Sequence, residues 1–159
     1  MNIKKILLTL TVAAACTAGY ASDGNDNKNT NKMEKENLIL TQEWDKVFPK
    51  SDKVSHSKVT FVNRYGITLA ADMHMPLNAE EPLPAIAVSG PFGAVKEQSS
   101  GLYAQEMAER GFLAIAFDPS YTGESGGSPR YVASPDINTE DFCAAVDFLS
   151  TLDKADPDR

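Results

Sequence analysis

The sequence predicts an α/β fold in which an antiparallel hairpin is followed by strands that alternate with helices. Three observations support this prediction. Residues 58–64 and 67–76 are two β-prone runs joined by a Tyr-Gly turn, which indicates a hairpin. Residues 85–90 and 112–120 are continuous apolar runs, as expected of strands buried on both faces of a parallel sheet. An amphipathic pattern follows each of these runs, which predicts a helix after each strand.

The hairpin is preceded by a leader segment, residues 38–54, whose apolar side chains we expect to pack on the domain. Trp44 and Phe48 are separated by four positions. This spacing predicts a short helix, which Pro49 would end.

The two later helices are predicted over residues 99–110 and 138–154. The second helix is expected to begin at Asn138 and to turn an apolar face toward the sheet. We expect Cys143, beside that face, to be a small buried side chain. The apolar face is predicted to consist of Phe142, Val146 and Leu149.

The first 21 residues have the features of a signal peptide: a basic start, an apolar run and small residues after it. Cleavage after Ala21 would release an exported protein, periplasmic or extracellular. An alternative is a lipoprotein anchored through Cys16, because "VAAAC" resembles a lipoprotein box. The apolar run is too short for a permanent membrane span. Residues 22–37 lack large apolar side chains apart from one methionine, which predicts a disordered linker.

Composition excludes several classes of partner. The formal net charge of −7 disfavours nucleic acids and anionic membrane surfaces. Cleavage would also leave Cys143 as the one remaining cysteine, so no intramolecular disulfide is expected. Asp72 and His74 would share one face of a strand, but two ligands without a third are weak evidence for a metal, and a polar pair at the rim is expected instead. We therefore expect no metal and no cofactor.

The stretch "GESGG", residues 123–127, matches the G-x-S-x-G pattern of a serine hydrolase's nucleophile elbow. An elbow needs a strand immediately before the serine and a helix immediately after it. Here the predicted strand ends near Asp118, and two glycines, Ser128 and Pro129 follow Ser125. Because these residues oppose a helix, Ser125 is rejected as a nucleophile and interpreted as a loop serine. Asp118 is expected to cap the following turn through its side chain.

Residues 55–159 resemble the N-terminal half of an α/β-hydrolase of the dienelactone-hydrolase-like type. The similarity lies in "SGPFG", "AERGF" and "FDPSYTGESGG". The resemblance implies an incomplete α/β-hydrolase sheet of strand order 1-2-4-3, with the third predicted strand, residues 85–90, at the edge. It also implies that the nucleophile, the acid and the catalytic histidine lie on later elements. The 159 residues alone are then expected to be inactive and insoluble or partly unfolded.

One part of a hydrolase site is expected within these residues. In this fold the loop after the third strand donates a backbone N–H to the oxyanion hole. Pro91 has no N–H, so the candidates are Phe92 and Gly93. A plain turn between a strand and a helix is the alternative. The full-length protein is expected to act on a small ester-like substrate.

Two other functions remain open at this stage. A dinucleotide-binding oxidoreductase fragment would use the strand, glycine loop and helix of residues 85–110, with Asp118 as the ribose-binding acid. However, Gly90 and Gly93 are only part of the three-glycine pattern. A non-catalytic secreted binding module is the other alternative, and it requires that the chain fold by itself.

Overall fold

The computed structural model describes residues 36–80 and 82–159. The predicted signal peptide, Cys16 and most of the predicted linker lie outside the described residues. The leader segment contains no helix or strand before Val54, so the short helix expected there was wrong. The Trp44 indole Nε1 instead donates a 2.8 Å hydrogen bond to the Phe48 carbonyl. The two rings meet edge to face at 5.7 Å, so their spacing reflects a local turn.

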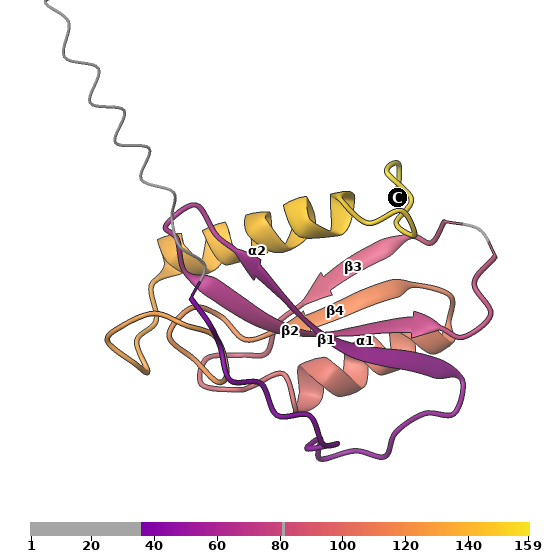
Figure 1. Cartoon of the computed structure of the whole chain (residues 1–159), viewed down its shortest axis with the longest axis horizontal. Helices are drawn as coiled ribbons and strands as arrows, with labels where there is room; N and C mark the ends of the chain where they lie inside the picture. Colours follow the sequence, from indigo (N-terminus) through magenta and orange to yellow (C-terminus); the bar gives the residue numbers. More distant parts are fainter. Residues whose placement is uncertain (1–35, 81) are drawn as a thin grey trace, which may run out of the picture. The chain divides into compact units, whose positions relative to one another are not determined.

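A four-stranded sheet of order β1-β2-β4-β3 forms the centre of the fold (Figure 1). The strands are β1 (Val54–Val62), β2 (Thr68–Pro76), β3 (Ala85–Val88) and β4 (Leu113–Phe117). β1 and β2 form the expected antiparallel hairpin, and β3 pairs with β4 in parallel. The predicted fold class and strand order are therefore confirmed.

The edge strand β3 differs from its prediction in burial. Its four residues are only partly buried, whereas all of β4 is buried. The reason is that β4 lies between two strands, whereas β3 has β4 on one side only. Outside the sheet, the last residues of the chain run beside the start of β3. Leu83 forms a parallel bridge with Ala155, and Ala85 N–H donates to the Arg159 carbonyl at 3.1 Å.

Two helices cover opposite faces of the sheet: α1 (Ser99–Glu109) and α2 (Pro135–Ser150) (Figure 1). α2 begins three residues before the expected Asn138, because Pro135 supplies a favourable first helical position. None of the helices in the described ranges is long and apolar enough to cross a membrane.

The face of α2 that packs on the sheet is not the one predicted. Phe142 and Val146 are 42% and 58% exposed, and Cys143 is also exposed. Ala144 and Ala145 face the sheet instead, and Leu149 does so as expected. The helix is rotated relative to the prediction because the polar residues of its first turns are buried. Asp141 accepts hydrogen bonds from Asn63 and Ser120, and Glu140 accepts one from Arg64 N–H.

The two faces of the sheet differ in chemistry. On the α2 face, large apolar side chains form the main core, with Phe61, Leu69, Ile115, Phe117 and Leu149 at its centre. On the α1 face, the apolar contacts are mostly alanines. Buried charged and polar side chains occupy the rest of that face, beneath the leader segment: Lys46, Asp72, His74, Lys96 and Asp118.

Candidate functional site

A cavity of about 620 Å³ lies at the carboxyl ends of β3 and β4. This edge is where ligands bind in open α/β sheets. Two loops line the cavity: residues 90–95 after β3, and two parts of the loop between β4 and α2, residues 119–123 and 131–133. The lining residues are Gly90, Pro91, Phe92, Gly93, Ala94, Val95, Pro119, Thr122, Gly123, Tyr131, Val132, Ala133 and Asn138.

The loop after β3 presents two free backbone donors at this cavity. Ala94 N–H bonds to the Pro91 carbonyl at 2.9 Å, which closes a tight turn. The N–H groups of Phe92 and Gly93, inside that turn, donate to no residue in the described part of the chain. The Phe92 ring is 84% exposed. Both oxyanion-hole candidates therefore lie at the cavity with unused N–H groups, and their catalytic role remains a prediction.

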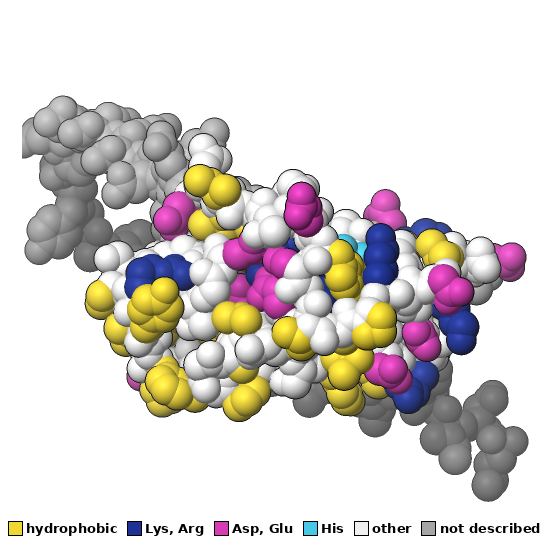
Figure 2. Space-filling view, turned by 90° about the horizontal axis from the view of Figure 1, so that it is seen from below, with side chains coloured by type: hydrophobic (Ala, Val, Ile, Leu, Met, Phe, Trp, Pro, Cys, Tyr) yellow, Lys and Arg dark blue, Asp and Glu magenta, His cyan; other side chains and the backbone are white. Residues whose placement is uncertain are grey.

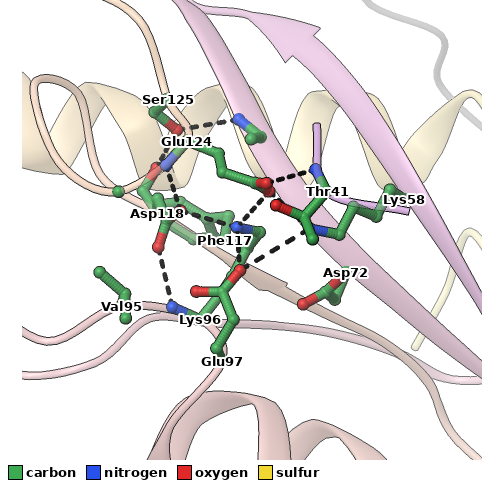
Figure 3. Close-up of polar contacts among 12 residues, drawn as sticks. Thr41, Lys58, Asp72, Val95, Lys96, Glu97, Phe117, Asp118, Glu124 and Ser125 are labelled. Carbon is green, nitrogen blue, oxygen red and sulfur yellow. Dashed lines mark hydrogen bonds and ion pairs between the residues drawn. The ribbon is translucent and has the colours of Figure 1, made fainter. Parts of the chain in front are cut away.

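Asp118, at the end of β4, joins the two loops that line the cavity (Figure 3). One carboxylate oxygen, Oδ1, accepts the backbone N–H of Lys96 at 2.8 Å. The other oxygen, Oδ2, accepts the backbone N–H of Glu124 at 2.9 Å. A Cβ at position 123 would collide with this carboxylate, and Gly123 also has φ +52°, so glycine is required there. Asp118 thus bonds to its own turn, as expected, and in addition fixes the loop after β3.

A group of charged side chains surrounds Asp118 on the α1 face. The fully buried Lys96 Nζ lies 2.9 Å from Asp118 Oδ2 and 2.8 Å from Glu124 Oε2. Lys96 also pairs with Glu97. Burial alone would lower the pKa of Lys96, but the Asp118 charge and the hydrogen bonds that Lys96 donates to the acidic groups outweigh it and raise that pKa. Lys96 therefore carries a positive charge that neutralises the carboxylates around it.

The acidic side chains of this group gather at the centre of the α1 face (Figure 2). Asp45, Glu97 and Glu124 bring carboxylate oxygens within 4.8 Å of one another, which is metal-ligand spacing. However, Lys58 Nζ lies 3.6, 3.8 and 2.6 Å from these three carboxylates. Burial would raise the pKa of Glu124, but its bonds to the Lys58 and Lys96 ammonium groups lower it to about 2. The lysines thus supply the positive charge that a metal would otherwise bring.

Ser125 lies at the base of this site and is buried. Its hydroxyl donates to the Asp118 carbonyl at 2.6 Å and accepts the Ala70 N–H at 2.8 Å. Ser125 therefore ties the loop after β4 to β2. In this structure the hydroxyl bonds to two backbone groups. The rejection of Ser125 as nucleophile stays a prediction.

Two tyrosines of the loop between β4 and α2 have a left-handed backbone. Tyr121 has φ 71° and Tyr131 has φ 60°, values that are rare for bulky residues. The Tyr131 N–H donates to the Tyr121 carbonyl at 2.9 Å, so each strained residue holds the other. This bond keeps Tyr131 at the wall of the cavity, although its ring is 85% exposed.

The predicted pair of Asp72 and His74 lies beneath the leader segment, away from the cavity. Asp72 Oδ1 is 2.8 Å from His56 Nε2, and Asp72 Oδ2 is 3.0 Å from the buried Lys46 Nζ. Neither ring nitrogen of the fully buried His74 has a hydrogen-bond partner among the described residues. Burial, and then the neighbouring His56, lower the pKa of His74 to about 4. These groups are buried polar contacts, where a pair at the rim of a strand was expected.

The mixed sheet of order β1-β2-β4-β3 with a helix on each face is that of an incomplete α/β-hydrolase fold. Similar solved structures include Est1E from Butyrivibrio proteoclasticus, described with bound ferulic acid. It is 26% identical, with a TM-score of 0.53 over 62% of this chain and 39% of that one. The chain belongs to the family described as X-Pro dipeptidyl-peptidase (S15 family), which it matches over residues 65–159.

Similar proteins include uncharacterized protein PA2218 of Pseudomonas aeruginosa, which is 62% identical over 151 residues. That match covers 94% of this chain and 40% of the relative. The crystal structure of PA2218 superposes with a TM-score of 0.74, covering 76% of this chain and 38% of that one. Thiohydrolase aneE of Aspergillus aculeatus is 31% identical, over 68% of this chain and 33% of its own length. The chain thus spans about two fifths or less of the length of these relatives.

Sequence reasoning missed Lys96 and Tyr131, which the structure places at the site. The signal for Lys96 was a lysine between two predicted elements, followed by an acid, which is common on any surface. Its partners Asp118 and Glu124 are 22 and 28 positions away in the sequence, so no local pattern joins them.

Proposed function

We propose that this chain contributes to an exported hydrolase of esters or related acyl bonds. In this proposal the loop of residues 89–93 supplies the oxyanion hole, through the N–H groups of Phe92 and Gly93. A Ser or Cys nucleophile outside the described residues attacks the acyl carbon. The negative charge that develops on the acyl oxygen is then stabilised by these preorganised donors.

The observation that carries the proposal is the pair of unused N–H groups at the cavity. Backbone donors that no described residue occupies need only exchange water for an oxyanion, and a loop that already fixes them keeps the reorganisation small. Asp118 and Lys96 support the loop from behind, because the Lys96 N–H bond to Asp118 lies three residues beyond Gly93.

The names of several relatives agree with acyl chemistry. They include thiohydrolases and an acyltransferase. The resemblance to dienelactone hydrolases is a finer statement and stays part of the proposal, since the family that matches is the S15 family. A dinucleotide-binding oxidoreductase is not proposed, because β2 runs antiparallel to β4 in the middle of this sheet.

The proposal is tested with the gene product at the full length that its gene encodes. We expect it to hydrolyse p-nitrophenyl acetate or butanoate, while residues 36–159 alone do not. The gene is expected to encode a strand followed by G-x-[SC]-x-G after Arg159, with a later Asp and His. Failure of the full-length product on every ester, or unrelated sequence at that point, would overturn the proposal.

Ser125→Ala is the matched control in this assay. We expect unchanged kcat/KM, because the hydroxyl bonds, among the described residues, to the Asp118 carbonyl and the Ala70 N–H alone. The substitution should lower the free energy of unfolding by about 1–3 kcal/mol, since both backbone groups lose a buried partner. Loss of hydrolysis in a folded Ser125→Ala protein would instead make Ser125 the nucleophile.

Export is part of the same proposal and rests on the sequence alone. Cleavage after Ala21 would give a mature protein that begins at Ser22, whereas a lipoprotein would begin at an acylated Cys16. Mass spectrometry of the mature N-terminus distinguishes the two.

A further inference from the structure

We propose that the cavity binds an uncharged, apolar ester or thioester, and that Phe92 and Tyr131 determine this specificity. The inference rests on the proposed function, and it adds the substrate class. The cavity, of about 620 Å³, is within the range of roughly 300–1,000 Å³ that is usual for small-molecule sites.

The first argument is the charge of the cavity wall. None of the residues that line the cavity carries a charged side chain. The exposed Asp136 is close in sequence but is not among the lining residues, and other nearby charged groups are engaged elsewhere. Asp118 and Glu124 both pair with Lys96, and the Arg130 guanidinium donates to the carbonyls of Gly123 and Ser125. The described residues that line the cavity therefore offer a ligand no charged side chain of either sign.

The second argument is the cost of placing a charged ligand there. An ammonium group that leaves water without meeting a carboxylate loses several kcal/mol of solvation free energy. A dipeptidyl-peptidase substrate carries its free amino group only two residues from the bond that is cut. This wall contributes no carboxylate for such a group, so it favours a substrate without an ammonium.

The third argument is the placement of two aromatic rings. Phe92 and Tyr131 line the cavity, and their side chains are 84% and 85% exposed. Large apolar groups that are exposed together beside a cavity mark a binding surface. Tyr131 is held there in a strained backbone conformation, by its bond to the Tyr121 carbonyl. Strain of this kind persists at ligand sites when the surrounding structure enforces it. The two rings thus provide apolar contact on two different loops of one uncharged cavity.

The test compares two esters that differ only in an amino group: methyl 3-phenylpropanoate and phenylalanine methyl ester. Both are assayed at pH 6, where the amine is protonated, with the gene product at its full encoded length. We expect kcat/KM for the uncharged ester to be at least about tenfold higher, as expected when an unpaired charge must enter an apolar site. Equal or higher kcat/KM for the amino ester would overturn the inference.

Variants of Phe92 and Tyr131 test whether the two rings cause the preference for the uncharged ester. Phe92→Ala and Tyr131→Ala should each lower kcat/KM for the uncharged ester by roughly 3- to 10-fold, with little effect on the amino ester. Phe92→Ala keeps the backbone N–H, so it tests the ring alone. Tyr103→Ala removes a half-exposed ring of α1 outside the cavity and should change neither value. If both cavity variants behave like Tyr103→Ala, the rings do not determine specificity.

Binding separates this inference from the proposed function. If the protein hydrolyses neither ester, the hydrolase proposal fails, and the dissociation constants of the two esters decide the substrate class. Tighter binding of the uncharged ester that Phe92→Ala weakens would still support the cavity assignment. Equal binding, or none because another part of the gene product covers the rings, would overturn it.

Discussion

The two faces of the central sheet are stabilised by different physical effects. Against α2, the sheet buries large apolar side chains such as Phe61, Leu69 and Ile115. Against α1 and the leader segment, it buries ion pairs, with Lys46 on Asp72 and Lys96 on Asp118. The charged face holds both loops of the candidate site through Asp118. The α2 face contacts the loop after β4 through Asp141, which accepts hydrogen bonds from Ser120.

The difference shows how stability and position are divided in this fold. Apolar burial is non-directional, so the α2 face favours a compact state without fixing each atom. Ion pairs and hydrogen bonds have defined geometry, and Asp118 uses both carboxylate oxygens to fix two loops. A buried pair adds little net stability, since desolvation offsets the attraction. We therefore infer that the charged face positions the site and the apolar face holds the domain together.

The largest effect on stability is expected from Lys96→Met, which removes the central cation of the charged face. The buried Asp118 carboxylate would lose its cation, and the partly buried Glu97 and Glu124 would lose Lys96 while keeping Lys58. The free energy of unfolding should therefore fall by about 3–5 kcal/mol. Urea denaturation measures this change. In the folded fraction, the amide NMR signals of Gly93 and Gly123 should shift, because Asp118 no longer has its counter-charge. Lys53→Met, at an exposed lysine, is the control. An unchanged free energy of unfolding would contradict the role assigned to the charged face.

Removal of an apolar side chain from the α2 face is expected to lower the free energy of unfolding without displacing the loops of the candidate site. Ile115 is fully buried in β4, so Ile115→Ala should cost about 2–5 kcal/mol through lost burial and a residual cavity. The same NMR signals of Gly93 and Gly123 should stay in place. If they move as far as in Lys96→Met, the two faces do not have separate roles.

The smallest effect is expected from His74→Leu, on the charged face but distant from the loops. The folded-state pKa of about 4 lies below the ordinary value of 6.5. The contribution of neutral His74 is therefore fully present above pH 6.5 and is lost as the pH falls toward 4. His74→Leu should remove this decline and, at pH 7, raise the unfolding free energy by about 1–3 kcal/mol, since two unpaired nitrogens are removed. Urea denaturation at several pH values measures both effects, and an unchanged pH slope would argue against a buried neutral histidine.

The sequence was sufficient for the fold because strand signals are local. The β-branched runs around Tyr65 and Gly66 gave the hairpin, and two apolar runs gave β3 and β4. The orientation of α2 was not predictable in the same way. Its apolar spacing pointed to Phe142 and Val146, whereas the partners that rotate it, Asn63 and Ser120, lie far along the sequence.

The candidate site could be predicted only in part, for the same reason. Phe92 and Gly93 followed from a strand ending in a glycine-containing loop, which is a local pattern. The charged group behind them joins Lys58, Lys96 and Glu124 from three separate segments. A lysine or glutamate that will be buried looks like any surface residue until its partner is known, so these pairs required the structure.

The leader segment has a practical consequence for the design of shorter proteins. A chain that began at the first strand, Val54, would keep every helix and strand of the domain. It would nevertheless lose Lys46, the cation on Asp72, and the Phe48 ring that packs against Gly101 at the start of α1. It would also lose Thr41, whose N–H donates to Glu124 at 2.6 Å. Truncation there would open the charged face to water, so a shortened protein should keep the leader segment from Thr41 onward.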